Sequence, residues 1–576
     1  LGGACNKALG NCSIVGGGNL NCSIGAFSGV VGGFSNCAAG DSSFIGGGCN
    51  NVVCGSIING SILGGCLNIV NAGCSSILGG KNNRICDGQR HSILNGCNNV
   101  IFGANWDSVA LGQSNSVLCG QSNLVGGSGS IVIGSSALSF GTSTAACGNN
   151  SLALGCSAVS FGANSIATGY ATCAIGDYSI ANGINNRTCG FASIVAGGGS
   201  CAVGNFANAN CAFGDYSSIL GGQRNSAISG FSSVLGGQGN SASGIFSSVV
   251  GGCGNSAVSY GSAVLGGINN CVYGTTQQGG VILGGSCNTH NNASGSGFIG
   301  GIVGGFCNTS YSSTLVIGNC NSGSGQSIII GNKNTSSDYF NMIIGGCANV
   351  LSGSFGSVRN SAILGAGSAN TIAGTSAATI LSSGSSNSIS GGAQKANILG
   401  GSDNTISASV GTIINGNSNN ISGSYGSVIN GYINTASGTY SFVGNGLLNR
   451  ACARHAFVGN GGPDCSSCSV NANIVTGDYS SILNGCINRA CDRFSSVLGG
   501  STNTASGIFS SVVGGCANVS SGLLSNIGGG ISNISAGISS HIGGGVSNCA
   551  VGQYSSIVGG VSNCVNDTAT FIGGGS

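Results

Sequence analysis

Four copies of one short sequence unit fill the stretch from Ser217 to Asn270. They read SSILGGQRNSAISGF (217–231), SSVLGGQGNSASGIF (232–246), SSVVGGCGNSAVSYG (247–261) and SAVLGGINN (262–270). The 15-residue unit recurs without a gap in this stretch, and a unit this short cannot bury a core by itself. A fixed period of this length therefore predicts a solenoid, in which each coil packs against the coils before and after it.

The order of residues within the unit predicts its local structure. Ser-Ser-(Ile/Val)-(Leu/Val) is a short segment rich in β-branched residues and is closed by Gly-Gly, which is typical of a strand followed by a turn. Asn-Ser-Ala and the residue after it form a second segment of smaller residues, also closed by a turn. The fold class predicted is all-β: a β-solenoid or β-roll with 14–15-residue coils and two short strands in each.

Glycine and asparagine mark one corner of every coil. The second glycine of Gly-Gly and the asparagine that follows it suit positions where the backbone needs a positive φ. Asparagines stacked at this corner are also expected to hydrogen-bond to one another as a ladder. The predicted ladder residues are Asn225, Asn240, Asn255, Asn270, Asn488, Asn503, Asn518, Asn533, Asn548 and Asn563.

The first strand predicts an interface. Neighbouring side chains of a strand point to opposite faces, so the pair Ile219 and Leu220 places one large apolar group on each face. Only one face can line the inside of the coil, and the other would form an apolar stripe larger than a soluble monomer usually exposes. We therefore expect another chain to cover this face. The predicted assembly residues are Leu220, Leu235, Val250, Leu265, Leu498 and Val513.

Composition excludes several function classes. Of the 576 residues, 115 are glycine, one is proline and only 4% are charged. The net charge of +2 does not indicate nucleic acid or an anionic membrane as a partner. No apolar run approaches the ~18 residues of a membrane span. All acidic residues are aspartates, and without glutamate, clustered histidine or a phosphate-binding loop we predict neither an enzyme nor a cofactor.

Between residues 131 and 190 the repeat shortens. Glycines recur at every seventh position from Gly134 to Gly190, in text such as LALGCSAVSFGANSIATGYATCAIGDYSIANG (152–183). This stretch resembles the head repeats of YadA-like trimeric autotransporter adhesins, with the 15-residue unit elsewhere as a looser variant. The resemblance implies left-handed coils and three chains packed side by side, with one strand of each coil lining the trimer interior.

The whole chain is predicted to be one continuous solenoid, residues 1–576. It comprises 15-residue coils at 1–130, strict 7- and 14-residue periods at 131–190, 15-residue coils with insertions at 191–460, a Pro- and Cys-containing insertion at 461–475, and strict 15-residue coils at 476–576. Because both termini fall inside a coil, we expect the chain to be part of a longer repeat protein that carries capping segments elsewhere.

The 31 cysteines follow the repeat. Cys22 and Cys37, and likewise Cys549 and Cys564, lie one coil apart in the same register. Stacked coils would bring their Cα atoms to ~4.8 Å, which a disulfide accepts. Two interpretations stay open: thiols that fill small slots otherwise held by alanine or serine, or disulfides between coils or chains. The odd count leaves at least one cysteine unpaired or bonded to another chain.

Metal sites are not predicted. Cys465 and Cys468 form a C-x-x-C motif without a second pair or a nearby histidine, which a zinc site would need. The repeated Gly-Asp-Tyr-Ser places an aspartate at a corner and lacks the spacing of calcium-binding repeats. The histidines are predicted to be exposed turn residues: His91, His290, His455 and His541.

These observations predict a structural protein: a rigid, non-enzymatic shaft of a multimeric extracellular fibre or adhesin. One alternative places the same architecture on a virion, as a phage or viral tail fibre or surface fibril, and the abundance of cysteine favours it. A second alternative is an ice- or glycan-binding solenoid. The expected partner is the chain itself, as a homotrimer or filament, with a host-surface or glycan ligand in addition. The expected location is extracellular, at a cell surface or a virion surface.

Overall fold

The structure is a computed structural model that describes residues 2–103, 106–199, 209–274, 279–291, 300–337, 340–352, 362–374, 379–391, 393–462 and 472–576. These residues form a parallel β-solenoid, which confirms the predicted fold class. They include no helix long and apolar enough to cross a bilayer. The chain divides into two compact units: unit 1 comprises Leu1–Cys287 and Asn292–Gly297, and unit 2 comprises Asn288–Asn291 and Phe298–Ser576.

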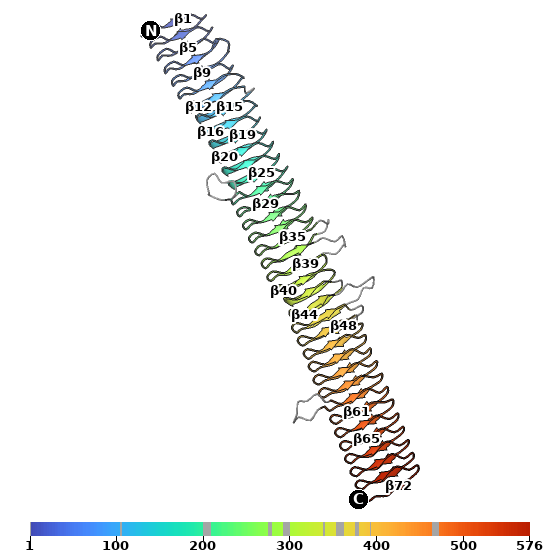
Figure 1. Ribbon diagram of the computed structural model, residues 1–576. Helices are drawn as coiled ribbons and strands as arrows, with labels where there is room; N and C mark the ends of the chain where they lie inside the picture. The colour runs from blue at the N-terminus through green and yellow to red at the C-terminus, as the bar shows by residue number, and fades with distance from the viewer. Residues whose placement is uncertain are drawn as a thin grey trace. The chain divides into compact units, whose positions relative to one another are not determined.

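Each coil contributes one strand to each of two sheets (Figure 1). In the 217–270 stretch, β28 (Ser218–Ile219) pairs in parallel with β30 (Ser233–Val234), and β29 (Ser226–Ala227) pairs with β31 (Ser241–Ala242). Paired residues hold the same place in successive units, so identical positions of the repeat stack. We call the sheet of even-numbered strands the even sheet and the sheet of odd-numbered strands the odd sheet. Unit 1 holds β1 to β36 and unit 2 holds β37 to β72.

The strands bury alternate residues. In one coil of the even sheet, Ser217 and Ile219 point inward, whereas Ser218 lies partly exposed and Leu220 is exposed. In the odd sheet, the inward residue of β29 is Ala227. A large side chain from one sheet therefore meets a small one from the other, and the narrow space between the sheets is filled. This pairing explains why the unit combines a β-branched strand with an alanine strand.

The 14-residue coils have longer strands in the even sheet. Leu138, Leu152 and Ile166 stack in register on three successive strands of this sheet. The 14-residue coils lack one glycine of Gly-Gly, but the pair itself does not prevent a long strand, because Gly126-Gly127 and Gly345-Gly346 both lie within one. The long strands of the even sheet are β12 (Ser92–Cys97), β14 (Val109–Gln113), β16 (Leu124–Ser128), β18 (Leu138–Thr142), β20 (Leu152–Cys156), β22 (Ile166–Tyr170), β24 (Ile180–Ile184), β40 (Leu315–Asn319), β42 (Ile328–Asn332) and β44 (Met342–Cys347).

The core of this part is thin. Between residues 158 and 181 the buried apolar residues are all alanines: Ala158, Ala167, Ala174 and Ala181. In most other coils the even sheet supplies isoleucine, valine or leucine at the inward position, as in the cluster from Ile329 to Val565 in unit 2. The long strands compensate, because each adds ladder hydrogen bonds between neighbouring coils where little apolar surface is buried.

The backbone conformation at the asparagine corner differs from the prediction at one position. The second glycine does take a positive φ, +86° at Gly237, but the ladder asparagine does not. The second left-handed position is instead the residue before it, for example Arg224 at φ 57° and Asn269 at φ 54°. The prediction of a positive φ for the ladder asparagine is wrong because this residue leads directly into the odd-sheet strand and points its side chain inward.

Candidate assembly interface

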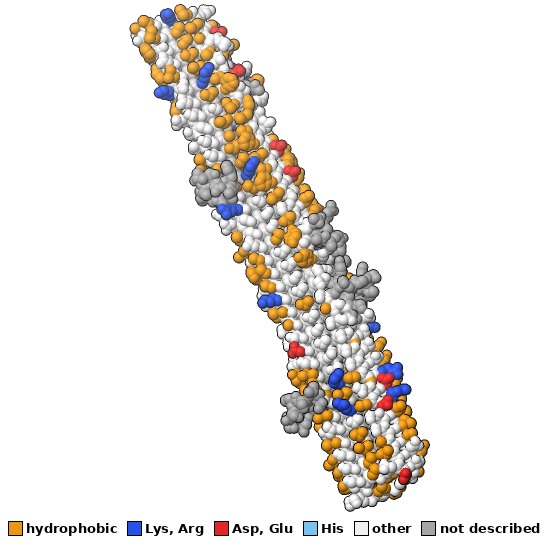
Figure 2. Space-filling view, in the orientation of Figure 1, with side chains coloured by type: hydrophobic (Ala, Val, Ile, Leu, Met, Phe, Trp, Pro, Cys, Tyr) orange, Lys and Arg blue, Asp and Glu red, His pale blue; other side chains and the backbone are white. Residues whose placement is uncertain are grey.

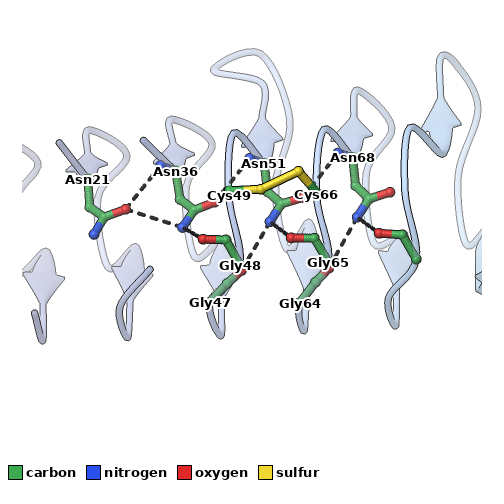
Figure 3. The surroundings of a disulfide bond; sticks show 11 residues. Asn21, Asn36, Gly47, Gly48, Cys49, Asn51, Gly64, Gly65, Cys66 and Asn68 are labelled. Carbon is green, nitrogen blue, oxygen red and sulfur yellow. Dashed lines mark hydrogen bonds between the residues drawn. A yellow bond between two sulfur atoms is a disulfide. The ribbon is translucent and has the colours of Figure 1, made fainter. Parts of the chain in front are cut away.

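The asparagine ladder joins successive coils at one corner (Figure 3). The backbone N–H of Asn36 donates to Oδ1 of Asn21 at 3.0 Å, and Asn51 makes the same bond to Asn36. The Nδ2 group of Asn36 donates to the carbonyl oxygens of Gly32 and Gly48, both at 3.0 Å. The Asn36 side chain thus accepts a bond from Asn51 and donates at least two, so both of its polar atoms are paired inside the solenoid.

All ten predicted ladder residues take this position. Each donates its backbone N–H to the asparagine one coil earlier, at 2.9–3.0 Å; they are Asn225, Asn240, Asn255, Asn270, Asn488, Asn503, Asn518, Asn533, Asn548 and Asn563. The spacing in sequence varies, from 13 residues between Asn308 and Asn321 to 24 between Asn186 and Asn210. The bond is present in both of these coils.

Replacing Asn240 by leucine is expected to destabilise its region of unit 1 by roughly 3–5 kcal/mol. The substitution leaves the N–H of Asn255 and the carbonyl oxygens of Gly236 and Gly252 without the partner they have now. Hydrogen exchange at the Asn255 amide and urea unfolding would both measure the loss. Gln238→Ala, an exposed position at the same corner, serves as the control and should change stability by less than about 0.5 kcal/mol.

The outer surface of the even sheet is apolar. We define the even face as the two outward residues that flank the inward residue of each even-numbered strand, for example Ser248 and Val250 around Val249. The predicted assembly residues lie on this face with exposed fractions of 43–55%: Leu220, Leu235, Val250, Leu265, Leu498 and Val513. Figure 2 shows one side of the molecule, on which hydrophobic side chains lie in patches with Lys, Arg and Asp side chains scattered between them.

In coils whose first even-face residue is serine or phenylalanine, the two residues of the even face compensate for each other in size. Where the first is serine, the second is usually leucine or valine, as in Ser248 and Val250. Where the first is phenylalanine, the second is glycine: Phe44 and Gly46, Phe442 and Gly444, Phe457 and Gly459, Phe571 and Gly573. A Cβ at Gly459 would lie 3.3 Å from the ring of Phe457. The ring therefore fills the space that leucine occupies in other coils.

Charge and cysteine distinguish the even face from the outward surface of the odd sheet. In the coils that the structure describes, no residue of the even face is lysine, arginine, aspartate or cysteine. The odd sheet carries outward cations on its strands: Lys7, Arg84, Arg187, Arg450 and Arg489. It also carries outward cysteines, among them Cys22 and Cys37. Depletion of charge is what marks the centre of a protein interface, so the even face is the better candidate.

No protein-family model and no curated protein matches the chain. The structure shows the architecture, a parallel β-solenoid in which most coils have about 15 residues. The assignment to YadA-like repeats stays a prediction that rests on the repeat text, as do the left-handed coil and the trimer.

The four cysteines singled out in the sequence come together in pairs. Cys22 lies directly opposite Cys37, and Cys549 lies opposite Cys564, on neighbouring strands of the odd sheet. The structure holds all four as thiols. Among the described cysteines, one pair forms a disulfide, Cys49 with Cys66 (Figure 3), which sequence spacing did not indicate. Cys465 and Cys468 of the C-x-x-C motif lie outside the described residues.

Aromatic side chains form two further ladders at the corner opposite the asparagines. Neighbouring ring centroids lie 4.6–5.5 Å apart. The ladder of unit 1 comprises Tyr178, Phe191, Tyr216, Phe231, Phe246 and Tyr260, and that of unit 2 comprises Tyr425, Tyr440, His455, Tyr479, Phe494 and Phe509. Most of these residues have a positive φ, and stacking between coils offsets part of that strain.

The aspartate of Gly-Asp-Tyr-Ser also joins neighbouring coils. Oδ1 of Asp177 accepts the backbone N–H of Ala163 at 2.8 Å, and Oδ1 of Asp478 accepts that of Arg454 at 3.0 Å. The side chains of Arg454 and Asp478 also form an ion pair at 3.9 Å, although both are about half exposed. The motif therefore stabilises a corner. Among the described residues, no group of three His, Cys, Asp or Glu side chains is arranged to hold a metal ion.

The prediction that all four histidines are exposed turn residues is wrong for two of them. His91 and His290 are fully buried, whereas His455 and His541 are exposed. His91 takes the inward position that Ser75 and Ser108 hold in adjacent coils. His290 lies on β37 (Thr289–Asn291) opposite the inward Ser310, whose hydroxyl lies 3.1 Å from its Nδ1. Position in the coil, rather than residue type, decides burial here.

His290 makes unit 2 sensitive to acid. Burial lowers the pKa of its imidazole from 6.5 to about 4. Above pH 6.5 the ring is neutral in both states; as the pH falls from 6.5 towards 4, only the unfolded chain gains the proton, so folding loses about 3 kcal/mol. His290→Val should abolish this loss. Thermal unfolding of wild type and variant at pH 7 and pH 4 would measure it, with the exposed His455→Ala as control.

Proposed function

We propose that the protein is a non-enzymatic structural solenoid that assembles with copies of itself through the even face. In this proposal each unit serves as a rigid shaft segment of an extracellular fibre or adhesin, at a cell surface or a virion surface. The observation that carries the proposal is the even face: it exposes an apolar residue in most coils, has no Lys, Arg, Asp or Cys in the described coils, and pairs a large with a small residue wherever its first residue is serine or phenylalanine.

The size compensation favours a packed surface over a solvated one. Water adapts to any outline, so a side chain facing solvent is under no constraint to shrink when its neighbour grows. A protein partner packs against a fixed outline, and interfaces are packed as closely as interiors. The substitution of Phe-x-Gly for Ser-x-Leu keeps the total volume similar, as a closely packed neighbour requires.

A second copy of the chain is the partner that fits best. The even face repeats once per coil, and strands of neighbouring coils are ~4.8 Å apart. A partner that meets every coil in the same way must have the same repeat, and an identical solenoid has it. Unit 1 has 18 even-numbered strands, β2 to β36. If each coil buries roughly 60 Å² of even-face surface, unit 1 would bury about 1,000 Å² against its partner, which exceeds the ~800 Å² per partner of a standard interface.

The mass of the intact chain in solution tests the proposal. Light scattering should give a multiple of 55.1 kDa, and three copies are expected if the resemblance to YadA-like heads extends to assembly. The mass should not change on dilution into the nanomolar range or on addition of reductant, because the even face has no cysteine in the described coils. A stable, soluble chain of 55.1 kDa at micromolar concentration would overturn the proposal.

A further inference from the structure

Two pairs of cysteines lie where neighbouring coils meet. Cys22 on β3 (Cys22–Ser23) is the direct partner of Cys37 on β5 (Cys37–Ala38). Cys549 on β69 (Cys549–Ala550) is the direct partner of Cys564 on β71 (Cys564–Val565). All four side chains point outward from the odd sheet. Adjacent strands place such partners at Cα separations of ~4.8 Å, within the roughly 4.4–6.8 Å that disulfides span.

The chain already bridges one such step. Cys49 and Cys66 also occupy equivalent positions of adjacent coils, each two positions before a ladder asparagine, and their Cα atoms lie 4.7 Å apart. They form a disulfide (Figure 3). The distance between coils is therefore one that a disulfide spans in this solenoid without opening the ladder, because the bond from Asn68 to Asn51 beside it is intact at 3.0 Å.

The paired thiols interact with each other. Burial raises the pKa of the Cys37 thiol, and the adjacent Cys22 thiol raises it further through its charge and a hydrogen bond. Burial and Cys564 act on the pKa of Cys549 in the same way. The other titratable groups next to the first pair are Cys54, which also raises the pKa of Cys37, and Lys7, which precedes Cys22 in the strand register. Each pair thus behaves as one dithiol.

We propose that Cys22–Cys37 and Cys549–Cys564 are redox sites, at which a small disulfide donor oxidises two thiols to an intrachain disulfide between adjacent coils. One thiolate attacks the donor, forms a mixed disulfide and releases one donor thiol. The second cysteine, as its thiolate, attacks that mixed disulfide, forms the intrachain bond and releases the second donor thiol. The protein loses two electrons and two protons overall, and the donor disulfide is reduced to two thiols.

Closure joins two coils that otherwise depend on hydrogen bonds and the packing of their core residues. A bond that closes a loop of one coil restricts the unfolded chain and opposes the separation of that coil from the next. The proposal is independent of self-assembly, because both pairs lie on the odd sheet and the even face has no cysteine in the described coils.

The chain contains a matched negative control. Cys173 and Cys211 point outward from the odd sheet in the same register as the proposed sites, but Arg187 lies between them on the intervening coil. Their Cα atoms are therefore two steps apart, at ~9.6 Å, beyond the ~7 Å limit for a disulfide. Oxidation should convert these two to separate mixed disulfides or leave them as thiols.

The experiment uses the full-length folded chain and oxidised glutathione as the donor. After exposure to a series of glutathione ratios, free thiols are alkylated and the digest is mapped by mass spectrometry. We expect linked peptides for Cys22–Cys37 and Cys549–Cys564 at donor concentrations at least 10-fold below those that modify Cys173 or Cys211. In Cys22→Ser, Cys37 should stop at the mixed disulfide, whereas Cys549–Cys564 should still close.

Two outcomes would overturn the proposal. One is that Cys22 and Cys37 carry separate glutathione adducts at saturating donor; the other is that they resist oxidation while Cys173 and Cys211 react. Light scattering of the same samples keeps this result separate from the proposed function. An unchanged assembly mass without the two disulfides overturns only the redox sites, and a single-chain mass with both disulfides formed overturns only the assembly.

Discussion

Replacing Leu235 and Val250 together by aspartate is expected to dissociate the assembly. The two side chains are neighbours on the even face, with exposed fractions of 45% and 43% in the single chain. In an assembly that covers this face, the variant would bury two unpaired carboxylates, each costing several kcal/mol. We expect at least a 1,000-fold weaker association, which light scattering over a dilution series from micromolar to nanomolar would measure.

The same coils offer a matched control on the opposite sheet. Ile228 and Val258 are exposed to 46% and 42% but point outward from the odd sheet. Their replacement by aspartate adds the same charge to the same region with the same loss of apolar surface. This control should assemble like the wild type. If both double variants dissociate, or if neither does, the even face is not the interface that holds the copies together.

The second large effect is expected at adjacent glycines. Gly237 has a φ of +86°, and a Cβ added there would collide with the carbonyl oxygen of Gly252 in the next coil. Neither group can move away without breaking the register of the corner, because both also border the Asn240 side chain. Gly237→Ala is therefore expected to cost about 3–5 kcal/mol or to prevent folding of the surrounding coils.

Its neighbour Gly236 is the control. A Cβ on Gly236 would meet no atom within 4 Å, and its φ is not positive. Gly236→Ala should therefore leave stability unchanged or raise it by up to about 1 kcal/mol, because alanine restricts the unfolded chain. Urea unfolding followed by circular dichroism would compare the two. Equal destabilisation by both substitutions would show that the corner depends on flexibility rather than on the space beside Gly237.

The period of the sequence was sufficient to predict the coil. A 15-residue spacing fixes which residues stack, and the alternation of a strand fixes that Ile219 and Leu220 point to opposite sides. What the period cannot give is the backbone conformation at a corner. Arginine and asparagine at positions 224 and 269 take the left-handed conformation, although the sequence there suggested that the following asparagine would do so.

Burial of single residues was hard to predict because position overrides residue type. His290 occupies an inward position, yet its residue type alone does not distinguish it from the exposed histidines. Counting from the nearest ladder asparagine, Asn288, would have placed it inside, since alternate residues after that asparagine point inward. The aromatic ladders leave a signal of the same kind in the sequence, because Phe231 and Phe246 end two successive copies of the repeat unit and so must stack.

A strict count of 15 does not predict the disulfide between Cys49 and Cys66. These cysteines are separated by 17 in the sequence, since their coil contains two extra residues. Their ladder asparagines, Asn51 and Asn68, are also 17 apart and still hydrogen-bonded. Position relative to the asparagine, rather than distance along the chain, therefore determines which cysteines meet.

The tolerance of the ladder to coil length has a consequence for how such a gene can change. Separations of 13 residues (Asn308 to Asn321) and 24 residues (Asn186 to Asn210) leave the Asn–Asn bond in place, so the length of a single coil can change without breaking the ladder there. Duplication or loss of a whole repeat through unequal recombination reproduces contacts that already exist and creates no new junction inside a unit. Point insertions change the outline of one coil, whereas recombination changes the number of coils, so the two kinds of variation can arise separately.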